Sequence, residues 1–174
     1  MSTQSRIIEA LAESIQMEIE GKDFYLKASA LSGNELGKKL LATLAEEEDE
    51  HRRRFSEIYD VLRRKMAWSQ DIKLPQSRIE RVTLRSLLGD YTDVPKVGQG
   101  EIDAVKLAMG LEDKTHDFYI GRAGVADSES EREFYSAIAA EESRHKLALL
   151  DYYEYLRDPA SWFVKKEHPS LDGA

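Results

Sequence analysis

Two histidines of this sequence occur in the same pattern, with one glutamate three residues before the histidine and another 30 residues before that glutamate. Carboxylates and imidazoles bind divalent metal ions, and residues three apart share one face of a helix. The two sets are separated by a constant offset of 94 residues; they are Glu18, Glu48 and His51, and Glu112, Glu142 and His145. The pattern predicts a metal site built from two similar halves.

The same offset relates other parts of the chain without a gap. Asp23-Phe24-Tyr25 matches Asp117-Phe118-Tyr119, and Leu62-Arg63 matches Leu156-Arg157. One Glu-x-x-His is expected by chance in a glutamate-rich chain, whereas two copies in register with two upstream glutamates are not. The chain therefore contains an internal repeat, and each half contributes three candidate ligands.

The candidate ligands lie within apolar stripes of the helices that must position them. Each Glu-x-x-His pair takes its place in a 3,4 spacing of apolar residues, which is one face turned toward a bundle core. Glu18 and Glu112 are also heptad-spaced with apolar or aromatic residues. The two Glu-x-x-His stripes are Leu41, Leu44, Glu48, His51, Phe55, Ile58 and Leu62, and Tyr135, Ile138, Glu142, His145, Leu149, Tyr152 and Leu156. All six ligands are expected to converge.

Four carboxylates in an apolar interior repel one another and lose hydration, so they take up protons unless a counter-charge is present. Two divalent ions balance four glutamates when both histidines are neutral. Oxygen and nitrogen ligands without sulfur suit iron or manganese, and shared glutamates can hold two such ions close together. The simpler alternative is a solvated charge run, because Glu46, Glu47, Glu48 and Glu50 are neighbours, but the heptad spacing singles out Glu48.

Four long segments have helical periodicity, and strand-like alternation is hard to find. The expected helices span about 5–31, 35–66, 101–124 and 128–157. Ser32-Gly33-Asn34 separates the first two, Asp127 or Ser128 caps the fourth, and Asp158-Pro159 ends it. A connection over 67–100 is long enough for a crossover, and 158–174 is expected to be a tail. The sequence thus predicts one all-α domain over 1–174, a ferritin-like four-helix bundle of two antiparallel helical hairpins.

Composition excludes several classes of function. The 174-residue chain has no cysteine, which excludes disulfides, iron–sulfur clusters and a rubredoxin-type centre, so electrons must come from an external donor. A net charge of −8 and a pI near 5.1 argue against nucleic acid as a partner. The sequence has no apolar stretch long enough to span a membrane. We expect a cytoplasmic protein.

The paired motifs resemble those of the rubrerythrin and erythrin branch of the ferritin-like diiron-carboxylate proteins, in a form without a rubredoxin domain, over about 5–157. The resemblance implies two iron ions as the cofactor and a reaction of ferrous iron with hydrogen peroxide or dioxygen. It also implies a role for each ligand: Glu18 and Glu112 as terminal carboxylates, Glu48 and Glu142 as bridging carboxylates, and His51 and His145 as the imidazole ligands.

Other residues near the motifs allow more than one interpretation. By resemblance, Tyr25 and Tyr119 hydrogen-bond to the site's carboxylates, although each also suits a large core residue. Many rubrerythrins carry a further glutamate where this chain has Thr115; it takes part in a ligand switch during peroxide reduction, so Thr115 argues against the usual peroxidase reaction. His116 is either an extra ligand or proton donor, or a partly exposed residue. Trp162 and Phe163 either mark a dimer contact or seal the bundle end.

Two kinds of function fit these residues. The favoured one is a diiron oxidoreductase of peroxidase or ferroxidase type. The alternative is an iron-binding or iron-handling module without turnover, and a dimanganese or mixed manganese–iron centre is a further possibility. The long crossover makes a homodimer with swapped hairpins physically possible.

Overall fold

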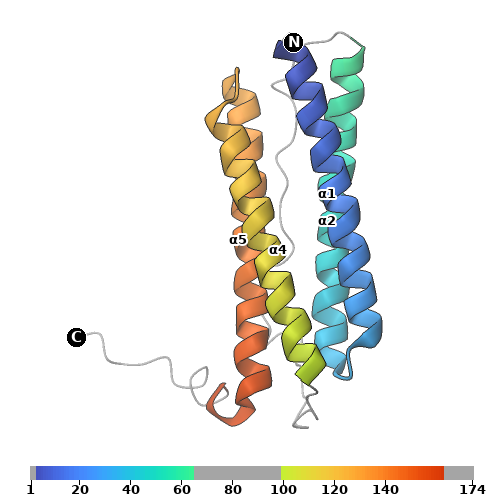
Figure 1. Ribbon diagram of the computed structural model, residues 1–174, viewed down its shortest axis with the longest axis vertical. Helices are drawn as coiled ribbons and strands as arrows, with labels where there is room; N and C mark the ends of the chain where they lie inside the picture. Colours follow the sequence, from blue (N-terminus) through green and yellow to red (C-terminus); the bar gives the residue numbers. More distant parts are fainter. Residues whose placement is uncertain (1–2, 65–98, 163–174) are drawn as a thin grey trace, which may run out of the picture.

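The computed structural model describes residues 3–64 and 99–162, which form four long helices. These are α1 (Thr3–Leu31), α2 (Glu35–Arg63), α4 (Gln99–Gly124) and α5 (Glu129–Arg157). Figure 1 shows α1 and α2 as one antiparallel hairpin and α4 and α5 as another, with the end of α2 and the start of α4 at opposite ends of the bundle. This all-α, ferritin-like arrangement confirms the predicted fold class.

Capping residues define the helix ends within each hairpin. The Asn34 side chain accepts a hydrogen bond from the Leu36 N–H at the start of α2. At the start of α5, Ser128 accepts one from the Glu131 N–H, and the Glu131 carboxylate accepts one from the Asp127 N–H. Both arrangements satisfy N–H groups that have no partner within the helix. The predicted turn at Ser32-Gly33-Asn34 and the Ser128 cap are therefore present.

Four predicted helix boundaries differ from those observed, by one to three residues. The first helix begins at Thr3 instead of residue 5, and the fourth at Glu129 instead of residue 128. The second helix was expected to reach Met66, but α2 ends at Arg63, because the Arg64 N–H bonds to the carbonyls of both Asp60 and Val61 in a tightened last turn. Gln99 and Gly100 belong to α4 and not to the expected connection. The rest of that connection and the tail beyond Trp162, including Phe163, lie outside the described residues.

The apolar core consists of two clusters, one in each half of the bundle. One contains Leu41, Leu44, Val105, Tyr152 and their neighbours, and the other contains Leu11, Phe55, Tyr119, Tyr135 and theirs. Along α2, Leu44 belongs to the first cluster and Phe55 to the second, so the segment with Glu48 and His51 lies between them. The candidate ligands therefore form a polar layer between two apolar ones.

Trp162 seals one end of the bundle. Its side chain is buried, its ring packs edge-on against Tyr155, and its Nε1–H donates to Asp151 Oδ1 at 2.8 Å. A buried indole with its N–H satisfied is a core residue. Of the two interpretations of Trp162, the structure supports the seal.

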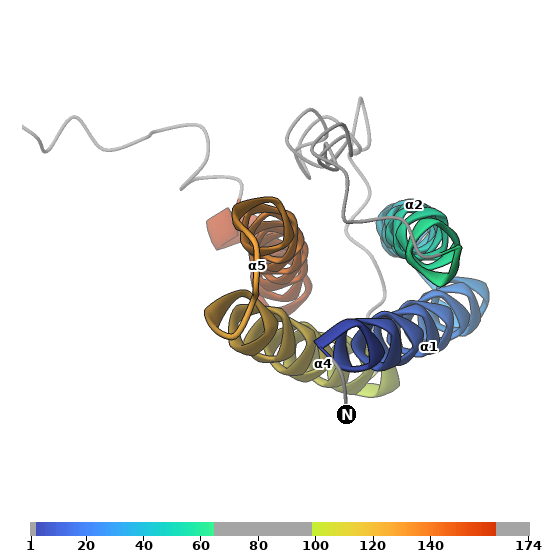
Figure 2. The same cartoon turned by 90° about the horizontal axis from the view of Figure 1, so that it is seen from above.

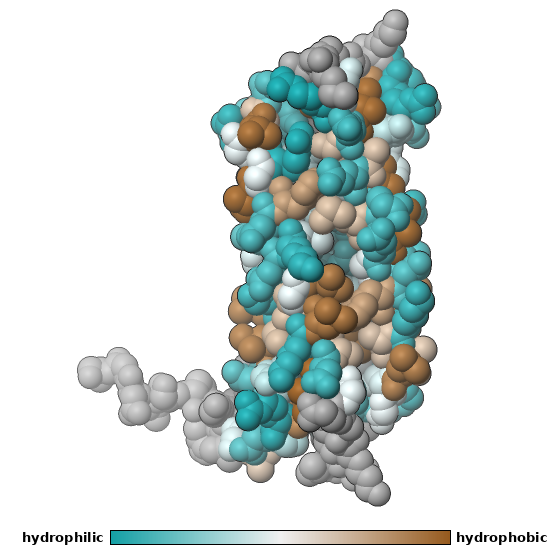
Figure 3. Space-filling view, viewed as in Figure 1, coloured by the Kyte–Doolittle hydropathy of each residue, from teal (hydrophilic) through white to brown (hydrophobic). Residues whose placement is uncertain are grey.

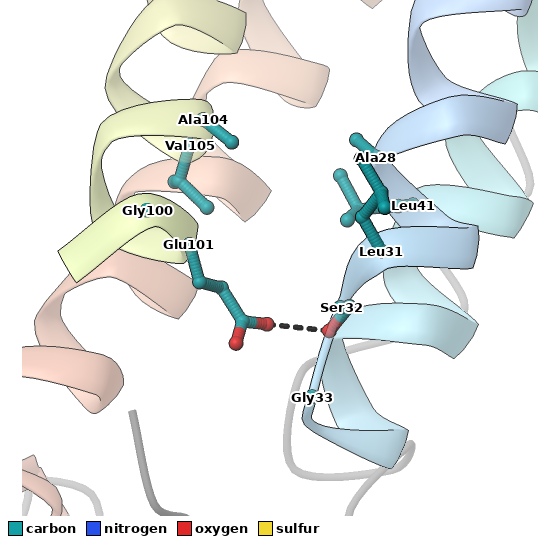
Figure 4. A pocket seen from close by; sticks show the side chains of 9 residues that line it. All are labelled: Ala28, Leu31, Ser32, Gly33, Leu41, Gly100, Glu101, Ala104 and Val105. Atoms are coloured by element: carbon teal, nitrogen blue, oxygen red, sulfur yellow. Dashed lines mark hydrogen bonds between the residues drawn. The ribbon is translucent and has the colours of Figure 1, made fainter. Parts of the chain in front are cut away.

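A polar cluster joins the hairpins at the same end. The Glu101 carboxylate accepts hydrogen bonds from Ser32 Oγ at 2.5 Å and from the Tyr152 hydroxyl at 2.6 Å. Beside it lies a pocket of about 400 Å3, in which α1 and α4 face each other across apolar side chains (Figure 4). The pocket is lined by Ala28, Leu31, Ser32, Gly33, Leu41, Gly100, Glu101, Ala104 and Val105, and by none of the candidate ligands.

The visible face of the molecule is mostly polar. In Figure 3, hydrophilic residues cover much of the visible face and hydrophobic ones are scattered among them. The exposed large apolar residues of α1 and α4 include Ile19, Leu26, Leu107 and Ile120. Among the described residues, no helix combines the length and the apolar character that a membrane span needs.

We expect Gly37→Ala to destabilise the fold, because the polar cluster leaves no room for a methyl group. The new Cβ would overlap the Tyr152 hydroxyl and lie 2.6 Å from Ser32 Oγ and 2.7 Å from Glu101 Oε1. Such overpacking costs about 1–3 kcal/mol. Gly110→Ala is the matched control: among the described residues no heavy atom lies near its Cβ position, so it should stabilise helix α4 by about 0.5–1 kcal/mol. Urea unfolding measures both, and equal effects would contradict the expectation.

Candidate metal centre

The six predicted ligands lie together in the buried polar layer, with each helix contributing to the cluster. Glu18 comes from α1, Glu112 from α4, and one Glu-x-x-His pair each from α2 and α5. All six residues are at most 3% exposed. In Figure 2, α1 lies next to α4, so the two hairpins pack side by side. The heptad spacing of the sequence accounts for this convergence.

The ligand atoms form two overlapping sets of four. Within each set, one carboxylate oxygen or imidazole nitrogen per residue lies within 4.8 Å of all the others. We call the first set the His51 position and the second the His145 position. The His51 position consists of Glu18, Glu48, His51 and Glu142, and the His145 position of Glu48, Glu112, Glu142 and His145. Glu48 and Glu142 belong to both, as bridging ligands must.

The atoms that face the centre have no hydrogen-bond partner among the described residues. They are Glu18 Oε2, Glu48 Oε1, Glu112 Oε2, Glu142 Oε1 and the Nδ1 atoms of His51 and His145. A buried polar atom without a partner costs about 1–3 kcal/mol, and more when it is charged. Coordination to cations would satisfy all six atoms at once. The donor set, made of carboxylates and imidazoles, fits divalent metal ions.

Two tyrosines hydrogen-bond to the carboxylates of Glu18 and Glu112, each tyrosine reaching across from the opposite hairpin. The Tyr25 hydroxyl on α1 donates to Glu112 Oε1 on α4, and the Tyr119 hydroxyl on α4 donates to Glu18 Oε1 on α1. Burial, followed by the adjacent carboxylate charge, raises the pKa of both phenols well above their usual value. Both tyrosines therefore stay neutral, and each leaves the second oxygen of its carboxylate facing the centre.

The two histidines turn the same atom inward. His51 Nδ1 lies 3.4 Å from Glu18 Oε2 and 3.3 Å from Glu142 Oε1, and His145 Nδ1 lies 3.2 Å from Glu48 Oε1. Their rings stack at 5.6 Å with an interplanar angle of 13°. Nδ1 is therefore the metal-facing atom of both imidazoles, and Nε2 faces away.

Glu141 lies behind the histidines and was not predicted as part of the site. Its side chain is 1% exposed, and its Oε2 atom lies 3.6 Å from His51 Nε2. Its Oε1 atom accepts a hydrogen bond from Arg144. Burial alone would raise the pKa of Glu141, but His51 and Arg144 lower it overall. The sequence signal that could have identified Glu141 is the internal repeat, in which Glu141 matches Glu47. In the structure both residues are buried.

His116 does not join the cluster. Its side chain is about one-third exposed, and its Nδ1 atom lies 3.1 Å from Asp117 Oδ1. Of the two interpretations of His116, the structure supports the partly exposed residue. Thr115, in contrast, reaches the site, because its hydroxyl donates to Glu142 Oε2 at 2.9 Å.

Comparison with known proteins agrees with this geometry. The family model described as rubrerythrin matches residues 9–153, which is most of the chain and includes all six candidate ligands. Searches of curated proteins and of solved structures gave no significant match.

Metal binding should release protons, because the raised pKa values of several groups in the cluster favour their protonated forms. Burial raises the pKa of Glu48 and Glu142. Burial alone would lower the pKa of His51 and His145, but the surrounding carboxylates raise both well above the usual value, which favours the protonated imidazoles. Because ligation needs deprotonated groups, the affinity for Mn2+ should fall as the pH is lowered. Calorimetry in buffers of different ionisation enthalpy counts the protons; an affinity independent of pH would contradict this expectation.

Glu141→Gln should weaken metal binding without removing a ligand, because it deletes the charge behind His51 and preserves the side chain's size. Loss of such a partner lowers metal affinity by about 10–100-fold. Glu133→Gln, at an exposed position of the same helix, is the control and should bind Mn2+ as the wild type does. Calorimetric titration compares the three proteins. Equal affinities would show that Glu141 does not orient His51.

Proposed function

This chain belongs to the rubrerythrin family, and we propose that it is a non-haem diiron protein that binds two iron ions and reduces hydrogen peroxide or dioxygen as Fe(II) is oxidised. One observation carries the proposal: two sets of four buried ligands share Glu48 and Glu142. Shared carboxylates favour a pair of neighbouring ions over two separate sites. The buried cluster of glutamates and histidines fits such a metal site.

Each ligand has its own part in this proposal. Glu18 and His51 would hold one ion, Glu112 and His145 the other, and Glu48 and Glu142 both. Tyr25 and Tyr119 fix the terminal carboxylates from the opposite hairpin, which keeps one oxygen of each directed inward. Because both phenols are held neutral, they serve as hydrogen-bond donors and not as acids near neutral pH.

Two ferrous ions, when bound, supply the two electrons that convert one hydrogen peroxide and two protons into two molecules of water. The chain itself has no cysteine with which to hold a rubredoxin-type centre. Repeated turnover therefore needs an external electron donor. That donor, the homodimer and the cytoplasmic location stay predictions from the sequence.

Thr115 favours a second candidate function, in which the chain binds or transfers iron without turnover. By resemblance, a glutamate at this place takes part in the ligand switch of peroxide reduction. Here the Thr115 hydroxyl instead donates to Glu142 and adds no carboxylate to the centre. The same oxygen and nitrogen ligands also suit manganese, so a dimanganese or mixed manganese–iron centre belongs with this alternative.

Anaerobic titration with Fe(II) tests the two-ion site. The wild type should reach an endpoint of two ions per chain, whereas Glu48→Ala should not, because it removes a ligand from both positions. Glu46→Ala is the matched control, since Glu46 belongs to the same glutamate run but is exposed. An equal loss in both variants would favour a solvated charge run over a buried centre.

Peroxide addition then separates the two functions. With an external reductant present, the diiron oxidoreductase should consume many equivalents of hydrogen peroxide per chain. A carrier should bind two ions and show a single stoichiometric oxidation. Elemental analysis of protein purified from its own source identifies the native metal, and manganese there would overturn the iron assignment.

A further inference from the structure

The internal repeat aligns two residues beside the metal centre that differ in chemistry. Gly21 and Thr115 are related by the 94-residue offset, and each follows a terminal carboxylate by three residues, Glu18 in one half and Glu112 in the other. Thr115 carries a hydroxyl group, and Gly21 has no side chain. The two halves of the centre are therefore unequal at this matched position.

Thr115 engages one of the two shared carboxylates. Its Oγ1 atom lies 2.9 Å from Glu142 Oε2, and 3.2 and 3.1 Å from the carbonyl oxygens of Leu111 and Glu112. The hydroxyl has one hydrogen to donate. A buried carboxylate is the strongest of the three acceptors, because its negative charge strengthens the hydrogen bond. Glu142 Oε2 therefore receives that hydrogen.

Gly21 occupies the equivalent place beside the other shared carboxylate. A Cβ atom built on Gly21 would lie 3.1 Å from Glu48 Oε2, so this oxygen approaches the backbone of α1 directly. The contact mirrors that between Thr115 and Glu142, but Gly21 offers no hydroxyl hydrogen. Glu142 Oε2 thus accepts a hydrogen bond from Thr115, whereas Glu48 Oε2 accepts none from Gly21.

The remaining oxygens of the shared carboxylates are arranged alike. Glu142 Oε1 lies 3.3 Å from His51 Nδ1, and Glu48 Oε1 lies 3.2 Å from His145 Nδ1. Each shared glutamate therefore turns Oε1 toward the histidine of the opposite hairpin. If each shared carboxylate gives one oxygen to each position, Oε2 would be the oxygen for the second one: Glu48 Oε2 would serve the His51 position, and Glu142 Oε2 would serve the His145 position.

We propose that Thr115 and Gly21 make the two metal positions unequal, so that the His51 position binds a divalent ion more tightly than the His145 position. The hydrogen bond from Thr115 occupies a lone pair of Glu142 Oε2 and reduces the negative charge that this oxygen offers to an ion at the His145 position. Glu48 Oε2 has no such competitor at Gly21. The inference rests on the proposed two-metal function and adds an order of filling to it.

The test uses the full chain, free of metal, with Mn2+ as the probe. Crystals grown with one equivalent of Mn2+ give the occupancy of each position from anomalous scattering, and calorimetry gives the two binding constants in solution. For the wild type, we expect the His51 position to fill first, with an affinity about tenfold higher. Only the size of this effect follows from the general rule that a change of outer-sphere partner alters metal affinity by about 10–100-fold; its direction follows from the charge that Thr115 withdraws from Glu142 Oε2.

Variants at residues 115 and 21 should change the affinities of the two metal positions in opposite directions. Thr115→Val preserves the shape but removes the hydroxyl, so the His145 position should gain affinity and the two occupancies should approach each other. Thr115→Ser restores the hydroxyl and should restore the wild-type order. Gly21→Ser offers Glu48 a hydroxyl of its own and should weaken the His51 position. It needs only a small shift of the flexible Glu48 side chain.

Three results would overturn the inference: equal filling in the wild type, preferred filling of the His145 position, or an order that Thr115→Val leaves unchanged. Each of these still shows two ions bound and leaves the proposed function intact. Failure of the wild type to bind a second Mn2+ or Fe(II) at any concentration would instead defeat the proposed function itself.

Discussion

Burial of four carboxylates and two imidazoles in one layer of an apolar bundle is the constraint on which the rest of the structure depends. Such groups tolerate removal from water only when their charge is balanced and their lone pairs are used. In this chain, six atoms face the centre without hydrogen-bond partners among the described residues. Protons can balance the charge, but two divalent ions balance it and also satisfy the lone pairs. The layer is therefore built for cations.

The same constraint explains how the two hairpins are joined at this level. Tyr25 and Tyr119 reach across from α1 and α4 and hydrogen-bond to the carboxylates of the opposite hairpin. Each tyrosine also belongs to one of the two apolar clusters that flank the polar layer. A tyrosine suits this place because its ring packs in the core while its hydroxyl satisfies a buried carboxylate. Apolar packing and ligand positioning thus use the same side chains.

Much of this arrangement could be predicted from the sequence, because two periodicities encode it. The heptad spacing identified the core faces and singled out Glu48 from a run of glutamates, and the 94-residue repeat picked out Glu142 independently. Glu141 was missed, although its repeat mate Glu47 stood in the same run. Neither residue follows the heptad stripe, and the contact of Glu141 with His51 depends on side-chain rotamers and on how α5 faces α2. The hydrogen bond from Thr115 to Glu142 is likewise a contact between helices, which a one-dimensional pattern does not specify.

The two halves of the repeat are alike at the ligands and diverge next to them. One heptad before Glu48 stands Leu41, and one heptad before Glu142 stands Tyr135. Tyr135 fills its end of the core, whereas Leu41 lines the pocket of about 400 Å3 at the other end. Ala28 and Arg122, which the 94-residue offset also relates, differ in the same way: Ala28 lines the pocket, and the Arg122 guanidinium lies 5.9 Å from the Tyr135 ring centroid.

The ligands fix how many ions the layer can hold, and the two halves contribute the same ligands. A difference between the two positions must therefore come from the residues around the ligands, and among these Gly21 and Thr115 are unmatched in chemistry and contact the shared carboxylates.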